Sequence, residues 1–204
     1  MKYVVANLKN SLNDSNIEEY VNNIRDVRYD NLVICPSKKY ISFFNGDNYE
    51  LGLQDYSDEY AQYIIINHYQ QKDDINTVKE KIELSKNRKL KIILCIGSNN
   101  IEDVDSIKKQ IDEYIDYNYD GILIAFEPFN MIGNNENIDV SIVNDMVNKI
   151  RKYTKNKYPI LYGGNVNEHN IERILNICDG VLVGRLSYDS IRFTKTLNKL
   201  IKNI

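Results

Sequence analysis

The chain has 204 residues, of which 43% are hydrophobic and 27% are charged, and its formal net charge is −3 at pH 7. This length allows one domain with a sizeable core, so we expect residues 1–204 to form a single domain. Proteins that bind nucleic acids or membrane surfaces need a basic face to meet phosphates, and the acidic balance argues against both classes. No apolar run approaches the length of a transmembrane helix.

The three cysteines, Cys35, Cys95 and Cys178, are odd in number and widely spaced along the chain. Neither a disulfide framework nor a metal site fits this spacing. We therefore expect a reducing, cytoplasmic compartment.

Eight short runs of β-branched and aliphatic residues recur, and a helical pattern follows most of them. The runs are 3–8, 32–36, 49–55, 63–68, 91–97, 121–128, 159–164 and 180–185. Continuous apolar strands separated by helices predict a parallel sheet that is covered on its outer face. Eight such units predict an α/β fold of the closed (β/α)8 barrel type. A doubly wound open sheet is the alternative, although it usually has fewer strands.

The connection between the third and fourth runs is too short for a crossover helix. Only YSDEYAQY separates Asp55 from Ile64. As a helix these eight residues would span about 12 Å, less than a strand with its turns, whereas extended they reach up to about 26–29 Å. We predict that the third crossover helix is missing, and that Tyr56, Tyr60 and Tyr63 cover the flank that it would protect.

Catalytic residues of such a barrel lie where the strands end. The polar residues and glycines at the predicted ends are Asn7, Lys9, His68, Cys95, Glu127, Gly163, Gly164, Gly184 and Arg185. Each has a purely structural interpretation, such as a solvated lysine, a core cysteine or a tight turn. Together they include a base, an acid and a cation at three strand ends, which only a closed barrel brings to one mouth.

Several of these motifs resemble the triosephosphate isomerase family. ANLKN (6–10) is similar to its N-x-K signature on the first strand, and IAFEP-x3-IG (124–133) to its catalytic strand and lid. ILYGG-x-V-N (160–167) is similar to the seventh strand and its loop. ILCIG and DGVLVG are similar to the fifth and eighth strands, so the resemblance to this TIM-barrel family covers essentially the full chain.

The resemblance implies the isomerisation of dihydroxyacetone phosphate and glyceraldehyde 3-phosphate through an enediol(ate). By the same resemblance, Glu127 is the general base and His68 is an electrophile kept neutral near a helix N-terminus. This family is a well-known example of how a protein adjusts the pKa values of its catalytic groups. Lys9 then steadies the developing negative oxygen, with Asn7 beside it. No cofactor or metal is implied, because the substrate carbonyl acidifies the carbon and the site supplies electrostatic stabilisation.

A small phosphorylated substrate is the partner that the resemblance implies. Residues 128–137, beginning at Pro128, would form a lid that closes over its phosphate and expels water from Glu127. Tyr162 resembles the tyrosine that latches this lid. The resemblance also implies phosphate contacts at Gly133, Asn165, Gly184 and Arg185. At Gly184 and Arg185 a short helix after the eighth strand would point its positive end at the phosphate.

The chain departs from the family pattern around the phosphate site. Asn165 stands in place of a serine, and Arg185 stands in place of a glycine. Residues 69–71 replace the Ser-Glu-Arg of the family, in which the glutamate helps to hold the lysine that corresponds to Lys9. Arg185 either adds a cation for the phosphate or fills its pocket. Two alternatives therefore stay open: an isomerase of another small aldose or ketose phosphate, and a non-catalytic phosphate-binding barrel.

The family dimer depends on a long loop after the third strand, which packs beside the active site of the partner. Here that segment is reduced to YSDEYAQY. We predict a monomer, or a dimer that forms through a different surface.

Overall fold

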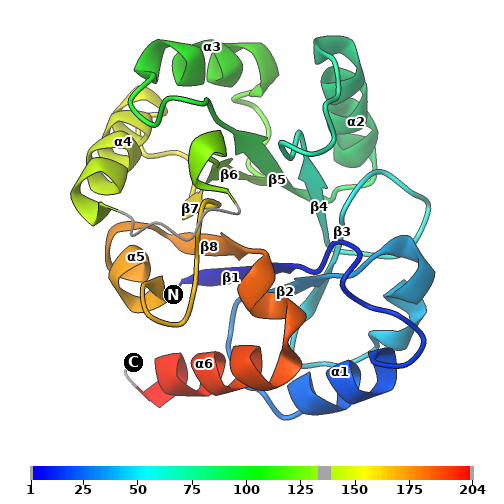
Figure 1. The fold of residues 1–204 in the computed structure, drawn as a ribbon. Coiled ribbons are helices and arrows are strands. Elements are labelled where there is room, and N and C mark those ends of the chain that lie inside the picture. The colour runs from blue at the N-terminus through cyan, green and yellow to red at the C-terminus, as the bar shows by residue number, and fades with distance from the viewer. Residues whose placement is uncertain (1, 133–138, 203–204) are drawn as a thin grey trace.

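The computed structural model describes residues 2–132 and 139–202, and in it eight parallel strands close into a barrel in chain order (Figure 1). Closure is achieved because β1 pairs with both β2 and β8. The strands are β1 (Tyr3–Asn7), β2 (Leu32–Cys35), β3 (Glu50–Leu53), β4 (Tyr63–Ile66), β5 (Lys91–Ile96), β6 (Ile122–Phe126), β7 (Ile160–Tyr162) and β8 (Gly180–Val183). This confirms the predicted (β/α)8 barrel, and the open sheet is excluded.

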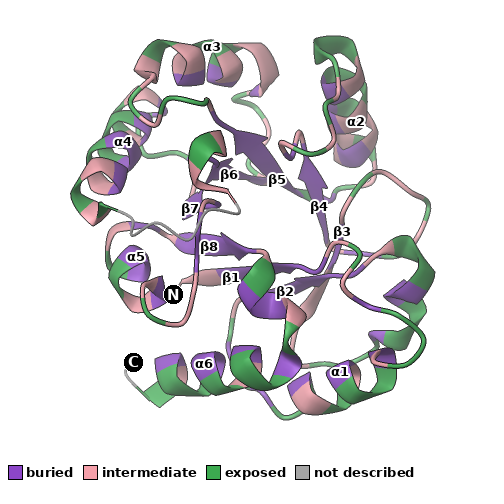
Figure 2. Cartoon of the chain, in the orientation of Figure 1, coloured by how far each residue is buried: buried purple, intermediate pink, exposed green. Residues whose placement is uncertain are grey.

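In the described part of the chain, six α-helices surround the strands. They are α1 (Ile17–Ile24), α2 (Ile75–Asn87), α3 (Val104–Tyr114), α4 (Val140–Tyr153), α5 (Ile171–Ile177) and α6 (Ser190–Lys202). Each buries the stripe of apolar residues that recurs at helical spacing, as Val143, Met146, Val147 and Ile150 do in α4. Figure 2 shows that the strands consist largely of buried residues, whereas buried and exposed residues alternate along the helices.

Strand side chains alternate between the interior of the barrel and the layer beneath the helices. The interior cluster is Val5, Val33, Cys35, Tyr63, Ile65, Ile93, Cys95, Leu123, Ala125, Leu161 and Leu182. At one end of this interior the hydroxyl of Tyr63 donates to Glu50 at 2.9 Å and accepts from Lys91 Nζ at 3.0 Å. These side chains fill the interior of the barrel, and ligands of such a barrel bind at the carboxyl ends of its strands, here called the mouth.

The predicted absence of a helix between β3 and β4 is confirmed, since residues 54–62 are all described and none of them is helical. A second connection is also reduced, which the sequence did not indicate. Between β2 and β3 the chain forms only a 3₁₀-helix, η1 (Lys38–Phe43). On the side of β3, loops therefore occupy the space between α1 and α2 (Figure 1).

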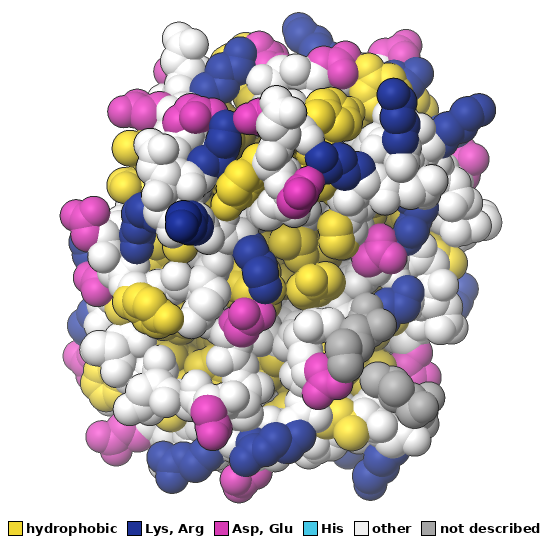
Figure 3. Space-filling view, turned by 180° about the vertical axis from the view of Figure 1, so that it is seen from behind, with side chains coloured by type: hydrophobic (Ala, Val, Ile, Leu, Met, Phe, Trp, Pro, Cys, Tyr) yellow, Lys and Arg dark blue, Asp and Glu magenta, His cyan; other side chains and the backbone are white. Residues whose placement is uncertain are grey.

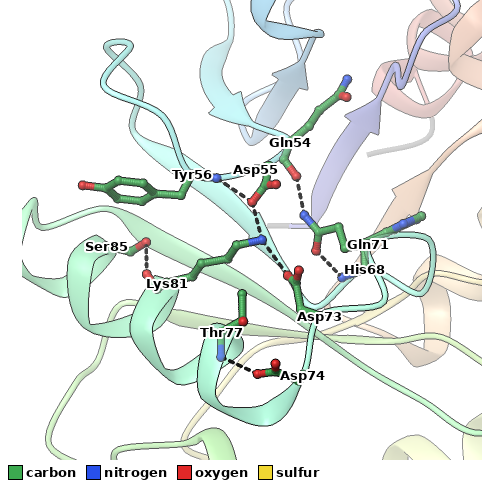
Figure 4. Close-up of polar contacts among 10 residues, drawn as sticks. All are labelled: Gln54, Asp55, Tyr56, His68, Gln71, Asp73, Asp74, Thr77, Lys81 and Ser85. Carbon is green, nitrogen blue, oxygen red and sulfur yellow. Dashed lines mark hydrogen bonds and ion pairs between the residues drawn. The ribbon is translucent and has the colours of Figure 1, made fainter.

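Side chains of α2 hold the segment that replaces the missing helix. Lys81 forms ion pairs with Asp55 at 2.7 Å and with Asp73 at 2.6 Å (Figure 4). Arg88, directly after α2, donates hydrogen bonds to the carbonyls of Ser57 and Glu59. Hydrogen bonds from a charged donor are stronger than neutral ones, so this short connection is pinned to its neighbour.

The predicted tyrosine cover is wrong for two of the three residues. Tyr63 lies inside the barrel, because its position in β4 points inward, and Tyr60 is 76% exposed. Only Tyr56 packs against the outer core, with the guanidinium of Arg88 5.8 Å from its ring centroid.

The surface on the far side from Figure 1 carries charged side chains of both signs (Figure 3). Lysines, arginines and acidic residues are interspersed over it rather than gathered into one patch. Within residues 2–132 and 139–202, none of the helices is long and apolar enough to span a bilayer.

Candidate active site

The alternation of β6 places Glu127 in the mouth. Leu123 and Ala125 point into the barrel, and Glu127, two residues further, continues the same face. Its backbone N–H donates to the carbonyl of Ile96 at 2.8 Å, which prolongs the pairing with β5 beyond the strand. The residue is only 1% exposed, so a carboxyl group is buried at the end of an apolar strand.

Two glycines make room for this glutamate. A Cβ added to Gly97 would lie 1.8 Å from the carbonyl oxygen of Glu127, an impossible distance to a backbone atom. A Cβ added to Gly163 would lie 2.9 Å from Glu127 Cγ. Both glycines therefore permit the close approach of β5 and β7 to the end of β6.

The carboxyl of Glu127 is held by groups from two neighbouring strands. Oε1 lies 3.4 Å from His68 Nε2, Oε2 accepts the N–H of Tyr69 at 3.2 Å, and the thiol of Cys95 also donates to the carboxylate. Burial raises the pKa of Glu127 to about 8, against the opposing effects of the Tyr69 N–H, the charge of Lys9 and Cys95. A carboxylate with a pKa near the working pH is suited to general-base catalysis.

His68 enters the mouth from the end of β4 through a left-handed turn. Asn67, just before it, has φ 62° and donates its side-chain amide to the carbonyl of Cys95. His68 Nδ1 accepts the N–H of Gln70 at 3.3 Å. A ring nitrogen that accepts a hydrogen bond carries no proton in neutral imidazole, so the proton sits on Nε2, the atom that faces Glu127.

Burial, followed by the charge of Lys9, lowers the pKa of His68 to about 4. A pKa this low leaves the imidazole neutral at physiological pH. The expected cause is wrong, however, because α2 begins only at Ile75 and no helix N-terminus adjoins His68 within the described residues.

Lys9 reaches the mouth from the loop after β1 in a conformation that non-glycine residues rarely adopt. Its φ is 47°, and its N–H donates to the side-chain oxygen of Asn7 at 3.3 Å. Asn7 is buried and continues the inward face of β1, two residues after Val5. The predicted pair is thus adjacent, and burial lowers the pKa of Lys9 from its usual value.

Two glutamines that the sequence did not single out as site residues connect the turns that carry Lys9 and His68, and Figure 4 shows the part of this connection from Gln54 through Gln71 to His68. The amide of Gln54, at the end of β3, donates to the carbonyls of Lys9 at 3.1 Å and Cys35 at 2.8 Å. Gln71 donates to the carbonyl of Gln54 and accepts the N–H of His68, both at 2.8 Å. The strand-end position of Gln54 was the available signal, whereas the partners of Gln71 depend on tertiary structure.

A cavity of about 230 Å³ occupies the mouth. The predicted residues that line it are Asn7, Lys9, His68, Glu127, Gly163, Gly164, Asn165, Gly184 and Arg185. Tyr69 and Tyr188 also line it, and the sequence did not indicate either as a site residue. A larger hollow of about 850 Å³ lies outside the barrel, along α5 and α6, but contains none of these strand-end groups. The chemistry therefore places the candidate site in the smaller cavity.

Arg185 and Asn165 form one corner of this cavity. Arg185 opens the 3₁₀-helix η3 (Arg185–Tyr188), which follows β8 as expected, and Gly184 precedes it. The guanidinium of Arg185 donates to Asn165 Oδ1 at 3.3 Å, and Arg185 is largely exposed. A cation and an amide are thus side by side at the rim, where an anion can be bound without deep burial of charge.

Of the expected lid and its latch, Ile132 lines the cavity, whereas Pro128 and Tyr162 do not line it. Pro128 precedes a 3₁₀-helix, η2 (Phe129–Met131), so the first part of the expected lid is regular rather than irregular. Tyr162 is fully buried in the outer core beside Phe126, with ring centroids 6.5 Å apart. Gly133 and the rest of the expected lid, residues 134–137, lie outside the described residues. The latch role of Tyr162 stays a prediction.

The arrangement can move protons on a small carbonyl compound. A carboxyl with a raised pKa adjoins a neutral imidazole whose N–H can donate to an oxygen, and an ammonium group lies across the cavity. In the described parts of the chain, no group of three or more His, Cys, Asp or Glu residues is arranged to hold a metal ion.

Comparison with known proteins identifies similar chains. A model of the triosephosphate isomerase family matches residues 49–200. The triosephosphate isomerase of Campylobacter jejuni subsp. doylei is 34% identical over 158 aligned residues, covering 72% of this chain and 69% of that protein. Those of Campylobacter jejuni subsp. jejuni and Ureaplasma parvum are 29% and 26% identical, and the alignments cover 94% and 98% of this chain and 97% and 99% of theirs.

The burial of Glu127 predicts a pH-dependent effect of the substitution Glu127→Gln on stability. A buried carboxyl whose pKa is raised from 4.5 to about 8 stabilises the fold fully below about pH 4.5, and this contribution is lost as the pH rises toward 8. Glutamine does not titrate. The free energy of unfolding of the variant, relative to that of the unsubstituted protein, should therefore increase between pH 5 and 8 by a few kcal/mol, at about 1.4 kcal/mol per pKa unit.

Urea unfolding followed by circular dichroism at several pH values measures this difference. His68 is present in both proteins, and its lowered pKa arises from burial and Lys9, so its own titration cancels in the comparison. A difference that stays constant from pH 5 to 8 would show that Glu127 titrates normally.

Proposed function

The chain belongs to the triosephosphate isomerase family, and we propose that it interconverts dihydroxyacetone phosphate and D-glyceraldehyde 3-phosphate. This is an aldose–ketose isomerisation. The observation that carries the proposal is the contact of 3.4 Å between a buried carboxyl with a raised pKa and the Nε2 of a neutral imidazole, in a cavity that Lys9 also lines. The small volume of the cavity suits a three-carbon phosphate.

In the proposed mechanism, the carboxylate of Glu127 removes the proton from the carbon beside the carbonyl group. The electron pair of that C–H bond forms the carbon–carbon double bond of an enediol(ate), and the carbonyl oxygen accepts a proton from Nε2–H of His68. His68 then takes the proton of the neighbouring hydroxyl, and Glu127 returns its proton to the other carbon. Lys9 stabilises the negative charge that develops on the oxygens.

We place the substrate phosphate at the corner formed by Asn165, Gly184 and Arg185. An arginine presents donors in a planar fork that matches phosphate oxygens, and the backbone at the start of η3 offers further N–H groups. The expected lid over residues 128–137 and the phosphate contact of Gly133 extend beyond the described residues, and both stay predictions.

Glu127→Gln tests the assigned general base. Glutamine keeps the shape of the side chain but cannot accept the proton, so kcat should fall by about 10²–10⁴-fold, the usual contribution of general acid–base catalysis. Coupled assays in both directions, with circular dichroism to verify folding, measure this change. Turnover that persists at the unsubstituted rate in the folded variant would rule out this role.

Arg185→Gly tests the phosphate corner, with Arg185→Lys as the variant that keeps the charge. If the guanidinium binds the phosphate, the glycine variant should raise KM about tenfold, which corresponds to about 1.4 kcal/mol, with kcat little changed. The lysine variant should recover part of the loss. A lower KM in the glycine variant would mean that the arginine obstructs the site.

One observation favours a second candidate, an isomerase of a longer aldose or ketose phosphate. Arg185 and Asn165 also line a neighbouring cavity of about 230 Å³, together with Asn167 and Arg192. This cavity could receive the far end of a longer chain. A kcat/KM for a five-carbon aldose phosphate that exceeds the value for the triose phosphates would favour this candidate.

We further propose that the protein is a monomer, or a dimer that does not use residues 53–62. The segment after β3 is short and is held against α2 by Lys81 and Arg88, so it does not project toward a partner. Light scattering coupled to size exclusion should give a mass near 23.9 kDa. A stable dimer that the substitution of the exposed Asp58 by arginine dissociates would contradict the proposal.

A cytoplasmic location is also part of the proposal. The three cysteines are free and buried, which suits a reducing compartment.

A further inference from the structure

Tyr69 lines the cavity of the mouth, although neither the fold nor the assigned chemistry requires an aromatic residue there. It follows His68 in a tight turn, in which the N–H of Gln71 donates to the carbonyl of His68 at 2.8 Å. The side chain of Gln71 fixes the same turn through His68 and Gln54. The backbone N–H of Tyr69 already contacts Glu127, so its ring is presented to the cavity from a rigid support.

The ring of Tyr69 contacts three different elements. Lys9 Nζ lies 5.7 Å from its centroid, within the range of a cation–π interaction. The ring of Phe129, the first residue of η2, stacks on it with centroids 6.1 Å apart and an interplanar angle of 29°. The imidazole of His68 is tilted against it at 5.3 Å.

These contacts matter most for Lys9. Its backbone is strained at φ 47°, and such a conformation persists only where the surroundings hold it. Its ammonium group is partly buried, and cation–π attraction grows when the cation loses water. Gln70, the next residue in the turn, is exposed and uncharged, so it offers no carboxylate to the cation.

The contact with Phe129 extends this arrangement to the segment after β6. The N–H of Phe129 donates to the carbonyl of Ser98, at the end of β5, so η2 is itself anchored to the barrel. The ring of Tyr69 therefore has the ring of Phe129 and the ammonium group of Lys9 as neighbours. The ring can restrict the positions that the ammonium group adopts.

We propose that Tyr69 is a positioning residue for the reaction: its ring, braced by Phe129, holds the ammonium group of Lys9 over the substrate site. The inference rests on the proposed function for its catalytic consequence, whereas the contact between ring and ammonium can be tested without any substrate. Phenylalanine retains the ring and leucine removes it. The pair Tyr69→Phe and Tyr69→Leu therefore isolates the aromatic contribution.

The direct test is the NMR signal of the Lys9 side chain in protein labelled with ¹³C at lysine Cε. The variant Lys9→Met assigns the signal by its disappearance. A methylene group beside a cation held over a ring experiences the ring current, so we expect an upfield shift in the unsubstituted protein and in Tyr69→Phe. In Tyr69→Leu the signal should return to the value of a free lysine.

Tyr60→Leu is the matched control, because Tyr60 is 76% exposed and lies far from the mouth in the segment after β3. It should leave the Lys9 signal in place. An unshifted Lys9 signal in the unsubstituted protein, or a signal that is the same in Tyr69→Leu, would overturn the proposal. If the leucine variant fails to fold, the presence or absence of the upfield shift of the Lys9 signal in the unsubstituted protein tests the proposal by itself.

The kinetic consequence is a difference between the two Tyr69 variants. We expect kcat/KM for the triose phosphates to be roughly 2- to 30-fold lower in Tyr69→Leu than in Tyr69→Phe, the factor that corresponds to cation–π energies of about 0.5–2 kcal/mol. Equal values in the two variants would show that the ring does not position a catalytic group. Absence of turnover in the unsubstituted protein would instead count against the proposed function, and the NMR test would still apply.

Discussion

The structure of the mouth depends on one constraint, which is that an ionisable carboxyl is buried at the end of an apolar strand. Burying such a group in water-free surroundings disfavours its charge, and Glu127 is only 1% exposed. The surroundings meet this cost in part with the N–H of Tyr69, the charge of Lys9 and the thiol of Cys95. The balance leaves the pKa near neutrality, which is where a general base is most useful.

Several features around this carboxyl have no obvious role in folding. Gly97 and Gly163 leave the space that Glu127 occupies, and two non-glycine residues at strand ends, Lys9 and Asn67, adopt positive φ. Strain of this kind is expected at functional sites and must be held by neighbouring groups. The side chain of Gln54 holds the backbone of Lys9 through a hydrogen bond to its carbonyl. Gln71 donates to the carbonyl of Gln54 and thereby connects the loop of Lys9 to the turn of His68.

The reduced flank shows how little of the helical layer the mouth requires. The helix between β3 and β4 is absent and that between β2 and β3 is replaced by η1, yet β2, β3 and β4 pair in register around the barrel. The hydrogen bonds that position Lys9 and His68 come from strand ends and turns. Lys81 and Arg88 on the α2 side hold the shortened connection in place of a helix. The site therefore requires the strand ends to be in position, but not a complete outer layer of helices.

The sequence alone determined the eight strands, the missing helix and the position of Glu127 at a strand end, because strand pattern and connection length are local properties of the chain. It also indicated Asn7, Lys9, His68 and Glu127 at the mouth, since they stand at strand ends, but not Tyr69 or Tyr188. Only the tertiary structure decided what these residues contact. Four features depend on groups brought together from different strands. They are the interior position of Tyr63, the second reduced connection, the neutral state of His68 without a helix N-terminus, and the ring of Tyr69 beside Lys9. Burial and charge act between such groups through space, and a linear pattern does not record those distances.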